Sequence, residues 1–329
     1  MCTCINFKTK DNYFGRTLDL EFNFEEKIVI TPRNYPFSLK SGDFIKTRYA
    51  MIGMAYVEGS YPMYADATNE EGLSIAGLRF TDCSYSEDIK DNRLNLTPYE
   101  LAPWFLGKYK SIEEIKKDIE KLNLLGIEYK DNLPVSKLHF MISDKNNESI
   151  VIEQTEDGFK YYNNPIGVMT NNPPFSYQLM NLNNYLNITS GCAYNRFSNN
   201  IDLVPYGQGL GAMGLPGDNS SCSRFVRAAF NKFNSKCMDD EVSSISQFFH
   251  ILDSVSMIEG TVETFTKEYN CTIYSCCMNI SKGIYYYRTY GNSQIVAVSL
   301  NSQNISSDKL TIYSPITKQQ ILYLNKSID

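Results

Sequence analysis

Strand-like segments gather at both ends of this 329-residue chain, and helix-like segments lie between them. The strand-like segments are short apolar runs bounded by Gly, Asp or Asn, a pattern typical of β-strands. They cover residues 27–31, 49–56, 72–80, 137–143 and 149–154, and then 272–279, 283–290 and 294–300. The last three are separated by SKG and YGN, which predicts two hairpins with tight turns. If strands from both ends share sheets, the chain has a layered α+β fold with helices on the outside.

The helical region shows clear start signals. Thr97 and Pro98 have the residue types of an N-cap and a first helical position. Ser111 and Glu114 form the sequence pattern of a capping box ahead of apolar residues that recur at helical spacing. The predicted helices cover residues 99–108, 112–122, 223–233 and 243–258.

Composition excludes several classes of protein. The formal net charge is −6 and no dense Lys/Arg cluster occurs, which argues against binding to nucleic acid or to anionic lipid. No run approaches the ~18 apolar residues that a membrane helix needs. The N-terminal residues lack the basic and apolar regions of a secretory signal, so we expect a cytoplasmic protein.

The nine cysteines do not form the pattern of a disulfide framework, because their number is odd and their spacing irregular. We expect most of them to be reduced, buried, small apolar residues. Their spacing also differs from that of zinc sites, and only His139 and His250 could supply imidazole ligands. The sequence therefore predicts no metal and no cofactor.

Cys2 has the most distinctive chemistry in the sequence. The chain begins MCTC, and removal of Met1 would leave Cys2 with both a thiol and a free α-amine. Since such an amine has a pKa of ~7.7–8.0 and a thiol one of ~8.5, the amine can serve as base and the sulfur as nucleophile near neutral pH. The alternative is an incidental cysteine in a frayed terminus.

The segment FGRTLDLEF (14–22) supplies two charges close to this cysteine in sequence. Arg16 beside the sulfur would favour the thiolate, and Asp19 could hold and orient the α-ammonium group. A regular strand puts these two residues on opposite faces, so we expect a bulge or turn between them if both serve one site. The alternative is a surface ion pair.

Other hydrolase chemistries are disfavoured. A serine–histidine triad needs a histidine base, but His139 lies in a strand-like segment and His250 on an apolar helical stripe. In both cases a satisfied core histidine is the favoured interpretation. No G-x-S-x-G elbow, P-loop or dinucleotide-binding motif is present, and GQGLGAMGLPG is predicted to be a loop.

Several motifs in fixed order resemble the choloylglycine hydrolase family. They are MCT, FGRTLDLEF, ADATNEEGLSIAGL (65–78), GVMTNNPPF (167–175), GLPGDNSSCSRF (214–225) and IYYYRTY. That family comprises bile salt hydrolases and penicillin V acylases, within the N-terminal-nucleophile hydrolases. The resemblance implies a four-layer αββα sandwich, one domain over residues 1–329 with Met1 removed, and hydrolysis of linear amides other than peptides.

The resemblance also implies roles for individual residues. Cys2 matches the nucleophile, with its own amine as proton carrier, and Arg16 and Asp19 match the pair that tunes and orients it. Asn171 matches the oxyanion-hole asparagine. Arg224 matches the active-site arginine, here at the start of a helix that we expect to be capped near Ser223.

One position departs from the family pattern. Arg79 stands where bile salt hydrolases typically have Asn and penicillin V acylases have Tyr. If it points inward, Arg79 would suit a substrate with a further carboxylate, hydroxyl or phosphate; the alternative is that it reaches Asp82 or solvent. Leu18 is also expected to bind substrate, and residues 56–66 and 124–137 to line an apolar slot.

The leading hypothesis is therefore an amidase for glycine- or taurine-conjugated bile salts, a homotetramer or dimer by resemblance. The alternatives are a penicillin V acylase or another N-acyl amino acid amidase, a family member that has drifted to an unrelated amide, and a non-catalytic thiol or binding protein. The complete set of site residues argues against the last alternative.

Overall fold

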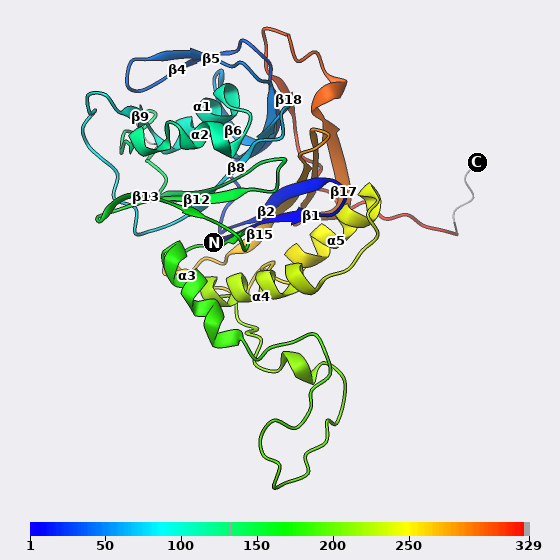
Figure 1. Ribbon diagram of the computed structural model, residues 1–329. Helices are drawn as coiled ribbons and strands as arrows, with labels where there is room; N and C mark the ends of the chain where they lie inside the picture. Colours follow the sequence, from blue (N-terminus) through cyan, green and yellow to red (C-terminus); the bar gives the residue numbers. More distant parts are fainter. Residues whose placement is uncertain (132, 326–329) are drawn as a thin grey trace.

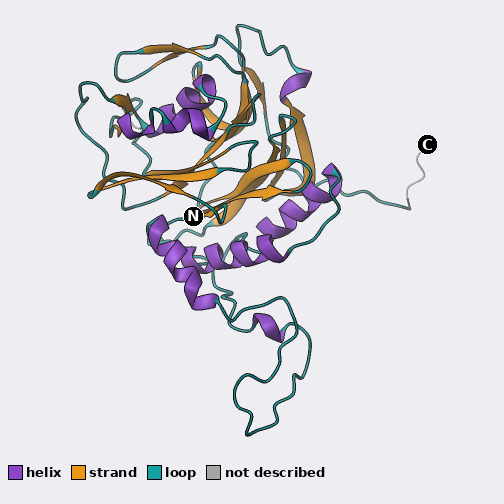
Figure 2. Ribbon diagram, viewed as in Figure 1, coloured by secondary structure: helices purple, strands orange, loops and turns teal. Residues whose placement is uncertain are grey.

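The computed structural model describes residues 1–131 and 133–325, and its helices lie on the two outer sides of a pair of packed β-sheets (Figures 1 and 2). Two helices cover one sheet, α1 (Leu101–Lys108) and α2 (Ile112–Lys116). Three cover the other, α3 (Phe175–Asn181), α4 (Ser221–Asn234) and α5 (Glu241–Asp253). The predicted α+β, four-layer sandwich with outer helices is confirmed.

The larger sheet has eight antiparallel strands in the order β13-β12-β11-β8-β7-β6-β3-β18. They are β3 (Lys27–Thr31), β6 (Met51–Glu58), β7 (Tyr61–Asn69), β8 (Ser74–Arg79), β11 (Leu138–Ser143), β12 (Ser149–Thr155), β13 (Gly158–Asn163) and β18 (Thr311–Tyr313). Buried residues of α1, such as Phe105 and Leu106, pack on its outer face in one apolar cluster. Burial of these side chains attaches the helix layer to the sheet.

The smaller sheet places the start of the chain in the interior of the molecule. Its order is β14-β1-β2-β15-β16-β17, so strands from both ends of the chain share it, as predicted. The strands are β1 (Cys2–Lys8), β2 (Asn12–Leu20), β14 (Val168–Met169), β15 (Cys271–Asn279), β16 (Ile284–Thr289) and β17 (Asn292–Ser299). The two predicted C-terminal hairpins are β15–β16 and β16–β17.

Two small sheets complete the fold, β4 (Pro36–Ser38) with β5 (Phe44–Lys46) and β9 (Leu94–Leu96) with β10 (Leu122–Leu124). The second pair corrects the helix predicted over residues 112–122. That helix ends at Lys116, and Leu122 begins β10, where it pairs with β9 in parallel. Backbone pairing with a distant segment here outweighs the helical spacing of the apolar residues.

The structure also corrects the prediction for α5, which begins at Glu241 and ends at Asp253 rather than spanning residues 243–258. His250 is not a core residue. Its side chain is 71% exposed and lies near Asp253 on the outer face of the helix. The predicted apolar stripe, including Phe248 and Phe249, does face the sheet and is buried.

A long segment between α3 and α4, residues 186–220, projects away from the layers (Figure 1). It contains the glycine-rich run predicted to be a loop, in which one short 3₁₀ turn forms at Leu210–Ala212. Several of its large apolar side chains are exposed: Leu186, Tyr194, Phe197, Val204, Tyr206 and Met213. Among the described residues, no helix has both the length and the apolar character required to cross a membrane.

Close strand packing at Gly15 gives a test of the fold. A Cβ atom at this position of β2 would lie 2.0 Å from the carbonyl oxygen of Cys276 in β15. Gly15→Ala is expected to lower the free energy of unfolding by about 1–3 kcal/mol, because the backbones must separate. Chemical denaturation measures the change. Gly207→Ala is the matched control, since nothing lies within 4 Å of its Cβ position, and equal stability of both variants would contradict the packing.

Candidate active site

Cys2 is the first residue of β1 and lies at a cavity between the two sheets. The residue is 3% exposed, and the cavity has a volume of about 830 Å³. Leu18 stands opposite Cys2 in the β1–β2 register and lines the same cavity. The remaining wall is largely apolar and includes Leu20, Phe22, Phe24, Tyr56, Met63, Tyr99, Tyr129, Leu133, Pro134, Val135 and Leu138. Both segments expected to line a slot contribute to it.

Arg16 and Asp19 approach the chain start from opposite faces of β2. Arg16 pairs with Cys4 in the register and so shares the face of Cys2, whereas Asp19 shares the other face with Thr17. The predicted bulge between Arg16 and Asp19 is wrong. β2 is regular there, and the irregularity lies in the neighbouring β15, between Thr272 and Tyr274.

Arg16 is a buried cation directed toward the second sheet. Its Nη1 donates to the carbonyl oxygens of Ala65 and Gly77, and its Nε donates to that of Thr17 at 3.2 Å. Burial alone lowers the pKa of Arg16, but the negative charges of Cys2 and other nearby groups outweigh that effect and raise it. Arg16 is therefore a cation close enough to Cys2 to stabilise negative charge on its sulfur.

A buried polar cluster around Asp66 adjoins Arg16. The hydroxyl groups of Tyr274 and Tyr285 donate to the Asp66 carboxylate, the latter at 2.7 Å, and the Cys276 thiol lies 3.4 Å from it. Burial raises the pKa of Asp66, against the opposing effect of Arg16. Sequence reasoning placed Asp66 in a family motif but gave it no role, although an aspartate within a buried strand is itself a signal.

Asp19 is a buried, hydrogen-bonded carboxylate on the face of β2 opposite to Arg16. Thr272 Oγ1 donates to its Oδ1 at 2.7 Å, Thr17 Oγ1 donates to its Oδ2 at 3.2 Å, and its backbone exchanges hydrogen bonds with Met1. Burial raises the pKa of the Asp19 carboxyl, and Arg224 and the terminal amino group oppose that shift. Asp19 thus contacts Met1 through its backbone, and its carboxyl group lies close enough to the Met1 amino group for the two charges to interact.

Asn171 and Arg224 meet at Cys2 from the helix side. The Cys2 backbone N–H donates to Asn171 Oδ1 at 2.8 Å, and Arg224 Nη2 donates to the same oxygen at 2.7 Å. Arg224 Nη1 donates to the carbonyl oxygen of Cys2 and to Thr3 Oγ1, each at 2.6 Å. Asn171 Nδ2 donates to the carbonyl oxygen of Arg79 at 2.8 Å, which leaves the amide a second N–H.

Arg224 is fully buried in the first turn of α4. The helix is capped by Ser220, whose Oγ accepts from the Ser223 backbone N–H, rather than near Ser223 as predicted. Burial lowers the pKa of Arg224, and the charges of Asp19 and Cys2 oppose the shift. A cation in this place requires those partners, because a helix N-terminus disfavours positive charge.

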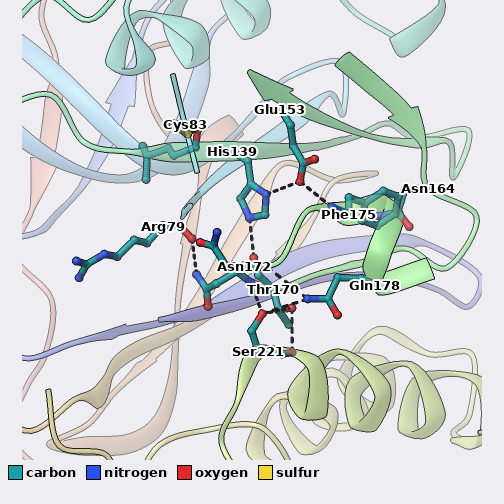
Figure 3. Close-up of polar contacts among 12 residues, drawn as sticks. Arg79, Cys83, His139, Glu153, Asn164, Thr170, Asn172, Phe175, Gln178 and Ser221 are labelled. Carbon is teal, nitrogen blue, oxygen red and sulfur yellow. Dashed lines mark hydrogen bonds and ion pairs between the residues drawn. The ribbon is translucent and has the colours of Figure 1, made fainter. Parts of the chain in front are cut away.

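Arg79 is exposed at the end of β8 and lines the cavity together with Cys2. The structure gives its side chain no hydrogen bond or ion pair within residues 1–131 and 133–325, so the predicted alternative of a contact with Asp82 is wrong. Its guanidinium extends away from Asn172 and Ser221 in Figure 3.

His139 is a buried, hydrogen-bonded core histidine, as predicted. The residue is 1% exposed, and its ring lies between Glu153 and the carbonyl group of Thr170. Thr170 directly precedes Asn171 in the sequence. Sequence reasoning did not connect His139 with the site, because the contact joins segments 31 residues apart.

Comparison with known proteins identifies the family of this chain. Residues 2–313 match the family described as linear amide C–N hydrolases, choloylglycine hydrolase family. A bile salt hydrolase/transferase of Lactiplantibacillus plantarum is 48% identical, covering 99% of this chain and 100% of the relative. A second bile salt hydrolase/transferase, of Clostridium perfringens, is 38% identical over 95% of this chain and 96% of its own length.

Solved structures show the same fold. The Cys2→Ala mutant of conjugated bile acid hydrolase from Clostridium perfringens superposes with a TM-score of 0.92 at 36% identity, covering 99% of this chain and all of the other. A penicillin V acylase from Agrobacterium tumefaciens gives 0.76 at 19% identity, covering 95% of this chain and 91% of the other, which shows a shared fold. The chain is therefore an N-terminal-nucleophile hydrolase in fold and belongs to the choloylglycine hydrolase family of linear amide C–N hydrolases.

Proposed function

We propose that this protein hydrolyses the amide bond of glycine- or taurine-conjugated bile salts, and that residues 1–329 form one domain that acts after loss of Met1. The observation that carries the proposal is the convergence of Asn171, Arg224 and Arg16 on Cys2 at one end of a largely apolar cavity. A cavity of about 830 Å³ lies within the range of small-molecule sites. The relatives named as bile salt and conjugated bile acid hydrolases support the substrate class.

The catalytic cycle follows from these positions. The α-amine of Cys2 takes the thiol proton, and the sulfur, favoured as an anion by Arg16, attacks the amide carbonyl carbon. The resulting oxyanion accepts the second N–H of Asn171, a contribution of about 10²–10³ in rate for such a donor. The ammonium group then gives its proton to the leaving nitrogen, and water hydrolyses the thioester. Arg224 orients the amine by holding the Cys2 carbonyl group and Asn171 Oδ1, and the buried Asp19 carboxylate places a negative charge near the chain start.

The nucleophile can be tested by mass and by substitution. Intact-mass analysis of active protein should show Met1 absent, because only then does Cys2 carry the amine. Cys2→Ser should lower amide turnover at least about 10³-fold with unchanged thermal unfolding, since a hydroxyl is a far weaker nucleophile at neutral pH. Cys4→Ser is the matched control. Full activity with Met1 retained, or full activity of Cys2→Ser, would contradict the mechanism.

Arg79 is proposed to bind an anionic group of the substrate. Arg79 lines the cavity and is exposed, and its side chain has no hydrogen bond or ion pair among the described residues. Glycine and taurine conjugates carry a carboxylate or sulfonate within a few bonds of the scissile amide. A guanidinium recognises such groups through paired N–H donors.

A substrate panel tests this role. Arg79→Asn should raise the KM for conjugated bile salts about 10-fold, as expected for loss of one charge-assisted contact, with a smaller effect on an uncharged bile amide. The panel compares glycine and taurine conjugates with penicillin V and N-acyl amino acids. Preference for penicillin V would contradict the proposed substrate class, and an unchanged ranking after Arg79→Asn would contradict the role of Arg79.

We further propose that the chain forms a homo-oligomer, a tetramer or dimer, and acts in the cytoplasm. The exposed apolar side chains of the projecting segment, residues 186–220, support association, because a lone chain leaves them in water. The nine cysteines, all unpaired, support a reducing compartment.

Light scattering after size exclusion measures the assembly. The wild-type protein should elute as a dimer or tetramer, and Phe197→Ser combined with Val204→Ser should shift it to smaller species by removing apolar contact area. Phe265→Ser, at an exposed site in another segment, is the control. A monomeric wild type would contradict the proposal.

A further inference from the structure

His139 lies in β11 between two other strands and is enclosed on all sides. Its ring stacks on Phe80 with centroids 4.6 Å apart and planes 4° from parallel. Glu153, on the adjacent β12, is only 2% exposed and faces it (Figure 3). A buried imidazole and carboxylate in contact are costly unless their hydrogen bonds serve a purpose in the fold or the site.

Both ring nitrogens of His139 face oxygen atoms. Nδ1 lies 3.0 Å from Glu153 Oε1, and Nε2 lies 2.7 Å from the carbonyl oxygen of Thr170. A backbone carbonyl only accepts, so Nε2 carries a proton. The Nδ1···Oε1 contact needs a second proton, whichever atom holds it. The pair therefore contains one proton more than a neutral imidazole beside a carboxylate.

Glu153 is fixed from a second direction. The backbone N–H of Phe175, the first residue of α3, donates to the same Oε1 atom at 3.0 Å. The carboxylate thus connects the ring of His139 to one end of segment 170–175, while the ring itself holds Thr170 at the other end. Together the two residues clamp this segment against the eight-stranded sheet (Figure 3).

The clamped segment carries Asn171. Ser221 holds it from the helix side, since Asn171 N donates to Ser221 Oγ at 2.9 Å and Thr170 Oγ1 donates to the Ser221 carbonyl oxygen at 3.1 Å. Between these two supports, the Asn171 side chain reaches the Cys2 backbone N–H. Movement of the Thr170 carbonyl group would therefore displace the amide that faces the nucleophile.

Among the described residues, the other titratable groups near His139 and Glu153 do not supply a charge that pairs with either residue. Burial raises the pKa of the nearby Cys83 thiol to about 11, with the Glu153 charge contributing, so that thiol stays neutral. Lys160 stands opposite Glu153 in β13, but it is exposed and its Nζ lies 3.6 Å from Asp157. Tyr162, also on β13, packs its ring against Phe175.

We propose that His139 and Glu153 are a positioning pair: through one shared proton they fix the Thr170 carbonyl group and so aim the free side-chain N–H of Asn171 at the oxygen of the substrate carbonyl group. This rests on the proposed function, because the aim matters only if Asn171 receives the oxyanion. Neither residue touches the substrate cavity in the described structure.

A nitrogen-15 NMR spectrum of the mature wild-type protein tests the shared proton directly. The chain has two histidines, and His250→Gln identifies the His139 signals by removing the others. The expected spectrum shows Nε2 protonated and Nδ1 with a proton shared with or donated by a carboxyl group. An unprotonated Nε2 would overturn the proposal, and this result requires no variant of the pair.

Kinetics test the positioning. His139→Phe keeps an aromatic ring against Phe80 but loses the bond to Thr170, and should lower kcat for a conjugated bile salt about 10²-fold with KM changed less than about twofold. Glu153→Gln should lower kcat less than His139→Phe does, because the glutamine amide can still form a hydrogen bond with the imidazole ring. His250→Gln, at the exposed site, should match wild type.

Separate outcomes decide separate claims. An unchanged kcat in a folded His139→Phe protein, verified by its thermal unfolding, would overturn the positioning role. A change confined to KM, with kcat unaltered, would overturn it equally. Absence of turnover in the wild type would contradict the proposed function instead, while the NMR spectrum still decides whether the pair shares a proton.

Discussion

The buried guanidinium of Arg224 is the contact on which the site depends. It joins α4 to the first two residues of β1 and to Asn171, with Nη1 and Nη2 both donating within 2.7 Å. Since each acceptor is buried, loss of the arginine would leave several carbonyl and hydroxyl groups unsatisfied at once. Burial of the charge is tolerated because the negative charge of Asp19 lies close enough to oppose the loss of hydration.

The alternation of side chains along β2 explains how a two-sheet sandwich concentrates charge at one residue. Arg16 points into the space between the sheets, and Asp19 points to the helix layer. Cys2, in the adjacent strand, therefore has Arg16 on the side of the second sheet, and Arg224 reaches its carbonyl group from the helix layer. Arg16 donates hydrogen bonds to main-chain carbonyl groups of β7 and β8 in the second sheet. The position of Arg16 in the cavity therefore depends on how the two sheets pack.

Signals that lie close together in sequence predicted their part of the structure well. The hairpins of β15, β16 and β17, the presence of α4, although its N-cap is Ser220, and the motif residues around Cys2 all follow from local patterns. Features that depend on distant partners did not follow. Leu122 joins a strand instead of a helix, and His250 faces solvent. The roles of Asp66 and His139 likewise require knowledge of which strands are neighbours.

The strand order of the smaller sheet has a consequence for the order of synthesis. The segment bearing Cys2 pairs with β2, and β2 in turn pairs Asp19 with Thr272 and Leu18 with Tyr274. More than four fifths of the chain must therefore leave the ribosome before the sheet that holds the first residues can close. Such long sequence separation slows folding. The earliest part of the polypeptide to emerge is thus among the last to reach its final environment, and a chain ending before residue 271 would lack the strand that completes it.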